Sequence, residues 1–391
     1  MCFHRGHERR PRLASNLALL ACLAMLACAR VAGADGMPAT FIFGDSLVDA
    51  GNNNYIVSLS KANYPPNGID FSGHQPTGRY TNGRTIVDIL GQEMGLGGFV
   101  PPYMDPNTTG DAVLRGVNYA SGGGGILNQT GSIFVSTWPS PFLLREILVL
   151  GGRLNLDAQI DNYANSRHDL IARHGEVAAV SLLRGALFAV TMGSNDFINN
   201  YLTPIFSVPQ RATTPPAAFI GAMISKYRQQ LTRLYLLDAR KIVVANVGPI
   251  GCIPYQRETN PSAGTACAAF PNQLAQAFNR RLRALVDELG ATLPGSRFVY
   301  ADVYRIFSDI IANYRSHGFE VADSACCYAG GRFGGLVPCG PTSQYCADRS
   351  KYVFWDPYHP SDAANALIAR RILDGGPADV WPVNVRRLIM A

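Results

Sequence analysis

Three side chains in this sequence have the types and spacing that nucleophilic acyl transfer requires. Ser46 follows an apolar run and a Gly-Asp pair, which leaves its hydroxyl in a turn of small and polar residues. His359 is a suitable base for a serine hydroxyl because imidazole titrates near neutral pH. Asp356 stands three residues before it, so its carboxylate can accept the Nδ1 proton and fix the ring's tautomer. The sequence predicts Ser46 as nucleophile and Asp356 and His359 as its activating pair.

The tetrahedral intermediate formed at such a serine needs hydrogen-bond donors for its oxyanion, each worth roughly 3 kcal/mol. Candidate donors are the backbone N–H of Ser46, backbone N–H groups in a glycine run at residues 122–125, and the side-chain amide of Asn195. These donors and the three reactive side chains form four polar clusters along the chain. These donors can form an oxyanion hole only if the fold brings the four clusters together.

The elements that must position these clusters are strands that end just before them. The carboxyl ends of parallel strands meet at one edge of a sheet. We therefore expect the clusters to converge, although 313 residues separate Ser46 from His359. The predicted strands that precede the clusters lie at residues 41–43, 112–120, 187–191 and 352–355.

Helical patterns alternate with apolar runs along the chain, which favours an α/β fold with a mostly parallel sheet covered on both faces. A helix is predicted after an N-cap at Thr214, with Pro215 as its first residue. No low-complexity linker divides the sequence, so we expect one domain over residues 35–391. Further strands are predicted at 241–247 and 298–300, and further helices at 86–94, 156–174, 274–289, 303–312 and 362–372.

The first 34 residues have the layout of a secretory signal peptide. Arginines precede an apolar run at 17–29, and small residues at Ala32 and Ala34 predict cleavage before Asp35. The run has 13 residues, fewer than the ~20 that span a bilayer, so a retained anchor is the minor alternative. No later segment is long and apolar enough to span a membrane. We expect a secreted, extracellular protein, with the cell wall as one destination.

Charge and cysteine usage agree with secretion. Without residues 1–34 the chain has 29 basic and 27 acidic residues, which gives no case for binding nucleic acid. Six cysteines remain, and an even number in an oxidising compartment predicts three disulfides, with 15 pairings open. Sequons at Asn107 and Asn128 predict N-glycans. No metal-ligand spacing, phosphate loop or dinucleotide fingerprint occurs, so we expect no cofactor and no metal. The six cysteines are Cys252, Cys267, Cys326, Cys327, Cys339 and Cys346.

The chain resembles the plant-type GDSL esterase/lipases of the SGNH hydrolase superfamily over nearly all of its mature length. The matching segments are FGDSLVDAGNN at 43–53, TGRYTNGRTIVD at 77–88, GVNYASGGGGI at 116–126, GSNDF at 193–197, VGPIGCIP at 247–254 and FWDPYHPS at 354–361. The resemblance implies a three-layer α/β/α flavodoxin-like fold with a five-stranded parallel sheet.

The resemblance also implies roles for individual residues. Ser46 corresponds to the nucleophile, Asp356 and His359 complete the triad, and Gly122 and Asn195 are oxyanion donors beside the Ser46 amide. Because the glycine run shifts the register, Gly123 is an alternative to Gly122. Residues 132–150 depart from the family pattern.

The function expected from these observations is that of a secreted serine esterase or lipase that hydrolyses carboxylic esters through an acyl-enzyme on Ser46. Its partners would be small-molecule, lipid or polysaccharide esters, and we expect a monomer. An acyltransferase that uses the same site with an alcohol acceptor is one alternative. A catalytically inert secreted protein that binds glycans or lipids is another. Loops around residues 60–80, 126–153 and 197–216 are expected to set the acyl specificity.

Overall fold

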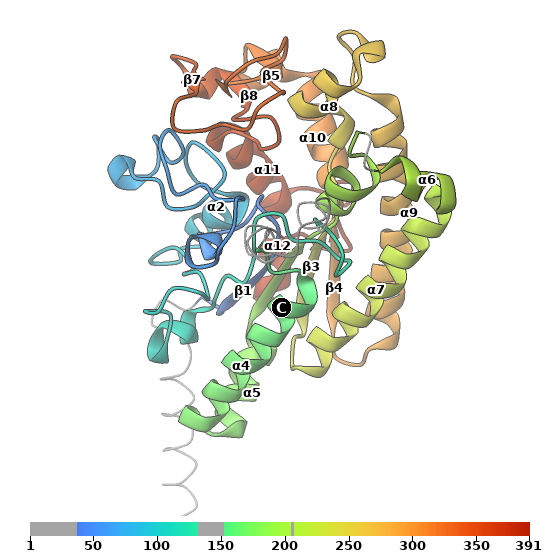
Figure 1. The fold of residues 1–391 in the computed structure, drawn as a ribbon. Coiled ribbons are helices and arrows are strands. Elements are labelled where there is room, and N and C mark those ends of the chain that lie inside the picture. The colour runs from blue at the N-terminus through green and yellow to red at the C-terminus, as the bar shows by residue number, and fades with distance from the viewer. Residues whose placement is uncertain (1–36, 132–151, 205–206) are drawn as a thin grey trace, which may run out of the picture.

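The computed structural model describes residues 37–131, 152–204 and 207–391 (Figure 1). The predicted signal peptide and the whole segment at 132–150 therefore lie outside the described residues. The central sheet has five strands in the order β1-β2-β3-β4-β9. These strands are β1 (Thr40–Gly44), β2 (Leu187–Thr191), β3 (Lys241–Ala245), β4 (Arg297–Ala301) and β9 (Val380–Trp381).

The predicted α/β fold is confirmed, with one change in the sheet. Strands β1 to β4 are parallel and in register, whereas the two-residue strand β9 pairs antiparallel with β4. The expectation of five parallel strands is therefore wrong for the fifth strand of this sheet.

The segment that precedes the glycine run adds backbone to the other edge of the sheet. Tyr119 N–H donates to the Ile42 carbonyl at 2.7 Å, and Ile42 N–H donates to Val117 at 3.0 Å. The predicted strand at 112–120 is nevertheless wrong in its first part, because Gly110–Arg115 forms a short 3₁₀ helix. The hydrogen bonds to β1 begin only at Val117.

Helices cover both faces of the sheet because each strand is apolar on both sides. Phe41 and Phe43 contact Tyr163 of α4, whereas Ile42 lies in a cluster with Val87 of α2. Figure 1 shows α4, α7 and α9 grouped together, apart from α2 and α11. The helices are α2 (Ile86–Glu93), α4 (Leu156–His174), α5 (Glu176–Gly185), α6 (Val208–Thr213), α7 (Pro216–Leu236), α8 (Pro254–Thr259), α9 (Ala269–Thr292), α10 (Val303–Ala312), α11 (Asp362–Asp374) and α12 (Val385–Met390).

Most predicted helices are observed within a few residues of their expected bounds. At the start of α7 the N-cap is Pro215 and the first helical residue is Pro216. The N-cap predicted at Thr214 is therefore wrong by one residue. A second proline still occupies the first helical position, where its missing N–H would have had no intrahelical partner.

The cysteine-rich region forms two small sheets of its own. Strand β5 (Val321–Ala325) pairs with β8 (Tyr352–Phe354), and β6 (Cys327–Tyr328) pairs with β7 (Gln344–Tyr345). Figure 1 shows β5, β7 and β8 together, above the central sheet. The strand before Asp356 is therefore not part of the central sheet, contrary to the expectation that a common sheet edge brings it to the site. Three disulfides are present, Cys252–Cys267, Cys326–Cys346 and Cys327–Cys339.

Across the described ranges, no helix is long and apolar enough to cross a membrane. The same residues contain no group of histidine, cysteine or carboxylate side chains arranged to hold a metal ion.

Candidate active site

Ser46 lies in a tight turn directly after β1. The N–H groups of Val48 and Asp49 both donate to the Asp45 carbonyl, at 3.2 and 3.1 Å. A Cβ atom on Gly44 would lie 2.4 Å from the Val48 side chain and 2.7 Å from a backbone carbonyl of β2, so only glycine fits where the strand enters this turn. The turn therefore leaves Ser46 at the carboxyl edge of the sheet.

Gln159 fixes the start of this turn and was not identified from the sequence. Its buried side chain accepts from the N–H of Gly44 at 2.9 Å and donates to the carbonyl of Gly44 at 2.8 Å. A glutamine on the buried face of a predicted helix is the signal that could have found it, because a buried amide needs partners on both its atoms.

Ser46, His359 and Asp356 form one hydrogen-bonded row. The Ser46 Oγ lies 2.7 Å from His359 Nε2, and His359 Nδ1 lies 2.8 and 2.7 Å from the two carboxylate oxygens of Asp356. With the proton on Nδ1 donated to Asp356, Nε2 is free to accept the serine proton. The structure thus brings the three predicted side chains together in the order that proton transfer requires.

The Asp356 carboxylate is held by its own loop. Its Oδ1 accepts the backbone N–H groups of Tyr358 and His359, each at 2.8 Å. Both Asp356 and His359 are buried, and the Tyr80 ring lies beside the imidazole with 5.2 Å between ring centroids. The spacing of three residues between Asp and His therefore closes a small ring of hydrogen bonds that orients the imidazole.

The N–H of Gly122 is already bonded to a side chain and is not available to an oxyanion. Its N–H donates to Asp49 Oδ2 at 2.9 Å. Both glycines line the cavity beside Ser46, but the N–H of Gly123, whose φ is 81°, has no acceptor among the described residues. The structure therefore favours Gly123, the alternative in the glycine run, over Gly122.

Asn195 is held in an orientation that leaves one of its two N–H groups uncommitted. Its Nδ2 donates to the Gly124 carbonyl at 3.0 Å, and its Oδ1 accepts from Asn199 at 3.1 Å. The N–H of Ser46 also has no acceptor among the described residues. Ser46, Gly123 and Asn195 all line one cavity, which supplies three donors at its wall.

Two further buried carboxylates hold the loops of the site and were not assigned a role from the sequence. Asp49 accepts N–H groups from the 51–52 turn and from Gly122, and Asp196 accepts those of Ile126 and Leu127. Burial raises the pKa of each to about 6, although these hydrogen bonds oppose the shift. Both therefore tie the glycine-run loop to a strand end.

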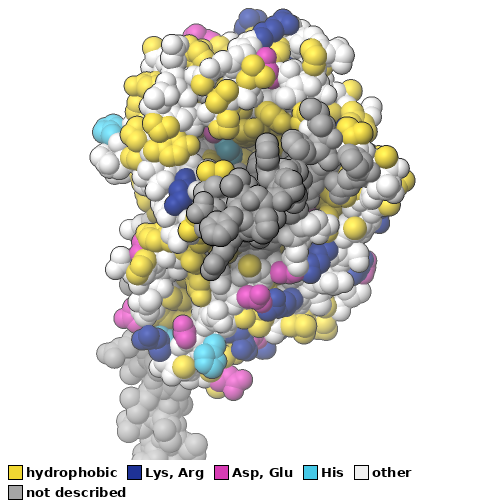
Figure 2. All heavy atoms as spheres, viewed as in Figure 1, with side chains coloured by type: hydrophobic (Ala, Val, Ile, Leu, Met, Phe, Trp, Pro, Cys, Tyr) yellow, Lys and Arg dark blue, Asp and Glu magenta, His cyan; other side chains and the backbone are white. Residues whose placement is uncertain are grey.

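The cavity beside Ser46 has a volume of about 420 Å³, within the range of pockets that enclose a small ligand. It passes the ends of β2 and β3 and reaches α10 and α11. Figure 2 shows hydrophobic side chains gathered around a hollow in the upper part of this face. Its apolar lining includes Ile250, Ile253, Val303, Phe307, Ile368 and Ile372.

The two predicted glycosylation sites present exposed acceptors. The side chains of Asn107 and Asn128 are both exposed, and the sequon threonine is exposed at Thr109 but buried at Thr130. Thr130 donates to Asp196 at 2.6 Å. Glycosylation at Asn107 and Asn128 stays a prediction.

An α/β sheet that carries a serine–histidine–aspartate row at its carboxyl edge, beside an apolar cavity, is the architecture of a serine hydrolase. Residues 40–372 match the family model GDSL-like lipase/acylhydrolase. The chain is 58% identical to GDSL esterase/lipase At4g16230 of Arabidopsis thaliana, over 90% of this chain and 91% of that protein. It is 51% identical to GDSL esterase/lipase At2g23540 of the same plant, over 90% and 88% of the two chains.

The chain therefore belongs to the GDSL-like lipase/acylhydrolase family, as its sequence motifs predicted. Membership of this family makes it a hydrolase of carboxylic esters.

Proposed function

We propose that this protein is a secreted serine esterase that cleaves esters of apolar acyl groups through an acyl-enzyme on Ser46. The observation that carries the proposal is the row from Ser46 Oγ through His359 to Asp356, with both hydrogen-bonded steps at 2.7 to 2.8 Å. A binding protein without catalysis has no use for such a row, so the inert alternative is not favoured.

In the first half-reaction, Ser46 Oγ attacks the ester carbonyl carbon while its proton moves to His359 Nε2. The carbonyl electron pair moves to oxygen, and the N–H groups of Ser46 and Gly123 and the Asn195 amide donate to that oxyanion. When the intermediate collapses, the alkoxide leaves with the proton from His359. Asp356 keeps its charge throughout and stabilises the imidazolium that forms.

In the second half-reaction, water gives a proton to His359 as its oxygen attacks the acyl carbon on Ser46. The second intermediate releases the carboxylic acid and returns the proton to Ser46 Oγ. The same donors serve both intermediates, because the charge develops on the same oxygen.

The apolar part of the cavity supports an apolar acyl group as the substrate class. The six apolar side chains named above come from the loop after β3 and from α10 and α11, and none of them carries a charge. Burial of each methylene there contributes about 0.8 kcal/mol to binding. Secretion is supported by the three disulfides, which persist in oxidising compartments.

The test is the mature protein, from residue 35 onward, with p-nitrophenyl esters and a fluorophosphonate probe. We expect hydrolysis and covalent labelling at Ser46, and we expect Ser46→Ala to lose both while it melts at the wild-type temperature. Ser58→Ala is a control at the cavity wall, because the Ser58 hydroxyl bonds the backbone of Ser60 and none of the proposed catalytic groups, and it should retain labelling. Wild-type turnover by Ser46→Ala would overturn the proposal.

A further inference from the structure

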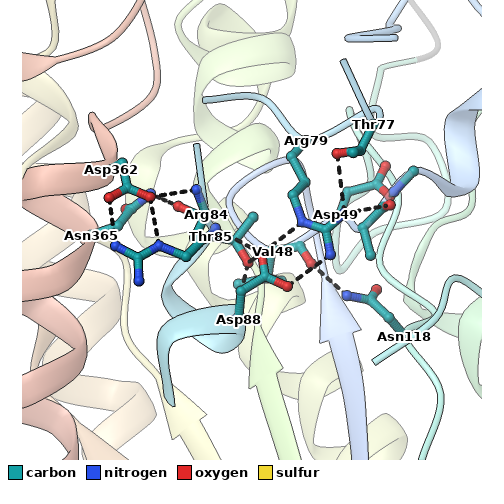
Figure 3. Close-up of polar contacts among 12 residues, drawn as sticks. Val48, Asp49, Thr77, Arg79, Arg84, Thr85, Asp88, Asn118, Asp362 and Asn365 are labelled. Carbon is teal, nitrogen blue, oxygen red and sulfur yellow. Dashed lines mark hydrogen bonds and ion pairs between the residues drawn. The ribbon is translucent and has the colours of Figure 1, made fainter. Parts of the chain in front are cut away.

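The central sheet alone does not account for the position of His359. Ser46 follows β1 of that sheet, but Asp356 and His359 follow β8, which pairs only with β5 among the described residues. Another part of the chain must therefore set the distance between the serine and the imidazole. Residues 79–85, which the sequence singled out without giving them a role, contact both loops (Figure 3).

On the serine side, the contact is made by Arg79. Its Nη1 donates to the carbonyl of Ala50 at 3.2 Å, four residues after Ser46. The same guanidinium forms a two-bond ion pair with Asp88 of α2, at 2.7 and 2.8 Å. It is buried and packs against the rings of Phe71 and Phe99, 4.8 and 5.4 Å from their centroids. A buried, fully paired guanidinium is a rigid anchor for the loop that follows Ser46.

On the histidine side, the contacts are made by Thr81 and Arg84. The Thr81 hydroxyl donates to the carbonyl of Pro360, the residue after His359, at 3.3 Å. Arg84 donates to Asp362 at the start of α11 through its backbone N–H at 2.6 Å and through its guanidinium at 3.0 and 2.8 Å. Figure 3 shows the Arg84 guanidinium facing Asp362.

Two further hydrogen bonds join residues 82–84 to the start of α11. The N–H of Asp362 donates to Asn82 Oδ1 at 2.9 Å, and Asn365 donates to the Arg84 carbonyl at 2.9 Å. A Cβ atom on Gly83 would lie 2.5 Å from Asp362 Oδ1, so the two segments touch. Residues 81–84 thus bond both the backbone and the side chains of the segment that follows His359.

We propose that residues 79–85 are a brace that fixes His359 opposite Ser46, with Arg79, Thr81 and Arg84 as positioning residues for the acyl-transfer step. This inference rests on the proposed function, because it assigns the brace to the Ser46–His359 pair. None of these three side chains lines the cavity. Loosening the brace therefore lowers the rate of proton transfer without weakening the binding of the acyl group.

The matched pair of variants is Arg84→Met and Arg386→Met. Arg386 likewise forms a bidentate ion pair, with Asp374 at the C-terminal end of α11, at 2.6 and 2.9 Å. The arginine side chains are similarly exposed, 36% for Arg84 and 38% for Arg386. Each substitution thus breaks an ion pair between an arginine and an aspartate of α11, but only Arg84 lies beside the loop that carries His359.

The measurement is kcat per active site, with active sites counted by fluorophosphonate titration. We expect Arg84→Met to lose at least tenfold in kcat per site, because a misplacement of about 1 Å can cost 10²-fold, while KM changes less than about twofold. Arg84→Lys should recover part of the loss, and Arg386→Met should match the wild type. A purely structural role would lower the number of active sites and leave kcat per site unchanged, which would overturn the proposal.

Two further measurements keep this test separate from that of the proposed function. Thr81→Val removes one hydroxyl with almost no change in shape, and we expect it to lower kcat per site less than Arg84→Met does. Amide hydrogen exchange of residues 356–362 should speed up in Arg84→Met but not in Arg386→Met, whether or not the esterase assay succeeds. Unchanged exchange there would refute the brace, whereas an unlabelled wild type would refute only the proposed function.

Discussion

Asp45, next to the proposed nucleophile, carries a carboxylate whose charge is unfavourable in the folded protein. Its Oδ1 accepts the N–H of Leu47 at 3.0 Å, whereas its buried Oδ2 has no hydrogen-bond partner among the described residues. Burial raises the pKa of Asp45 from 3.8 to about 7, and the Leu47 N–H and nearby His359 offset only part of this. Asp45→Asn removes the charge with little change in shape.

The direction of the pH effect follows from proton binding. An acid whose pKa is raised by folding holds more protons in the folded state, so its ionisation lowers the free energy of unfolding as pH rises. For Asp45 the penalty is absent below pH 3.8 and complete above about pH 7. A shift of about 3 pKa units corresponds to roughly 4 kcal/mol, of which about 3 kcal/mol develops between pH 5 and pH 8.

The assay is urea unfolding of wild type and Asp45→Asn at pH 5 and pH 8. We expect the free energy of unfolding of the variant, relative to wild type, to rise by about 3 kcal/mol from pH 5 to pH 8. Any constant cost of the new amide cancels in this difference, as does the titration of Asp49 and Asp196, which are present in both proteins. We also expect kcat to fall at pH 8, because Asp45 loses the charge that stabilises protonated His359.

A difference between the two proteins that does not change with pH would refute this reasoning, because the predicted stabilisation comes only from ionisation. If the variant instead lost stability relative to wild type as the pH rose from 5 to 8, the reasoning would also be refuted, because the Asp45 charge would then be favourable in the folded state.

Two more predictions concern the walls of the cavity. Asn195→Ala should lower kcat by 10²- to 10³-fold, as loss of one oxyanion donor does; steady-state kinetics check this, and unchanged kcat would remove Asn195 from the oxyanion hole. Val303→Phe should reduce the apolar space in the cavity and shift the preferred ester to shorter acyl chains, losing about fourfold in kcat/KM for each displaced methylene. Hydrolysis of p-nitrophenyl acetate is the internal control, and an unchanged chain-length profile would contradict the assignment of the acyl pocket.

Local patterns in the sequence determined the elements and the reacting groups. The apolar runs that became β2, β3 and β4 and the helical spacing of α4 and α10 are visible without any long-range information, because burial selects side chains at fixed periods. The Asp356–His359 pairing is also local, since a separation of three residues lets one carboxylate reach both the backbone and the ring. The family motifs agreed with the role of Ser46 that its place after an apolar run had already predicted.

Only the tertiary structure decided which of these groups are free to act and what holds them. The N–H of Gly122 is occupied by Asp49, 73 residues away in sequence, and no pattern within the glycine run reveals that. The disulfide pairs and the place of β8 outside the central sheet depend likewise on contacts between distant segments. Arg84 meets Asp362 across 278 residues, because hydrogen bonds and ion pairs form between whatever groups the packed core brings together, irrespective of their separation along the chain.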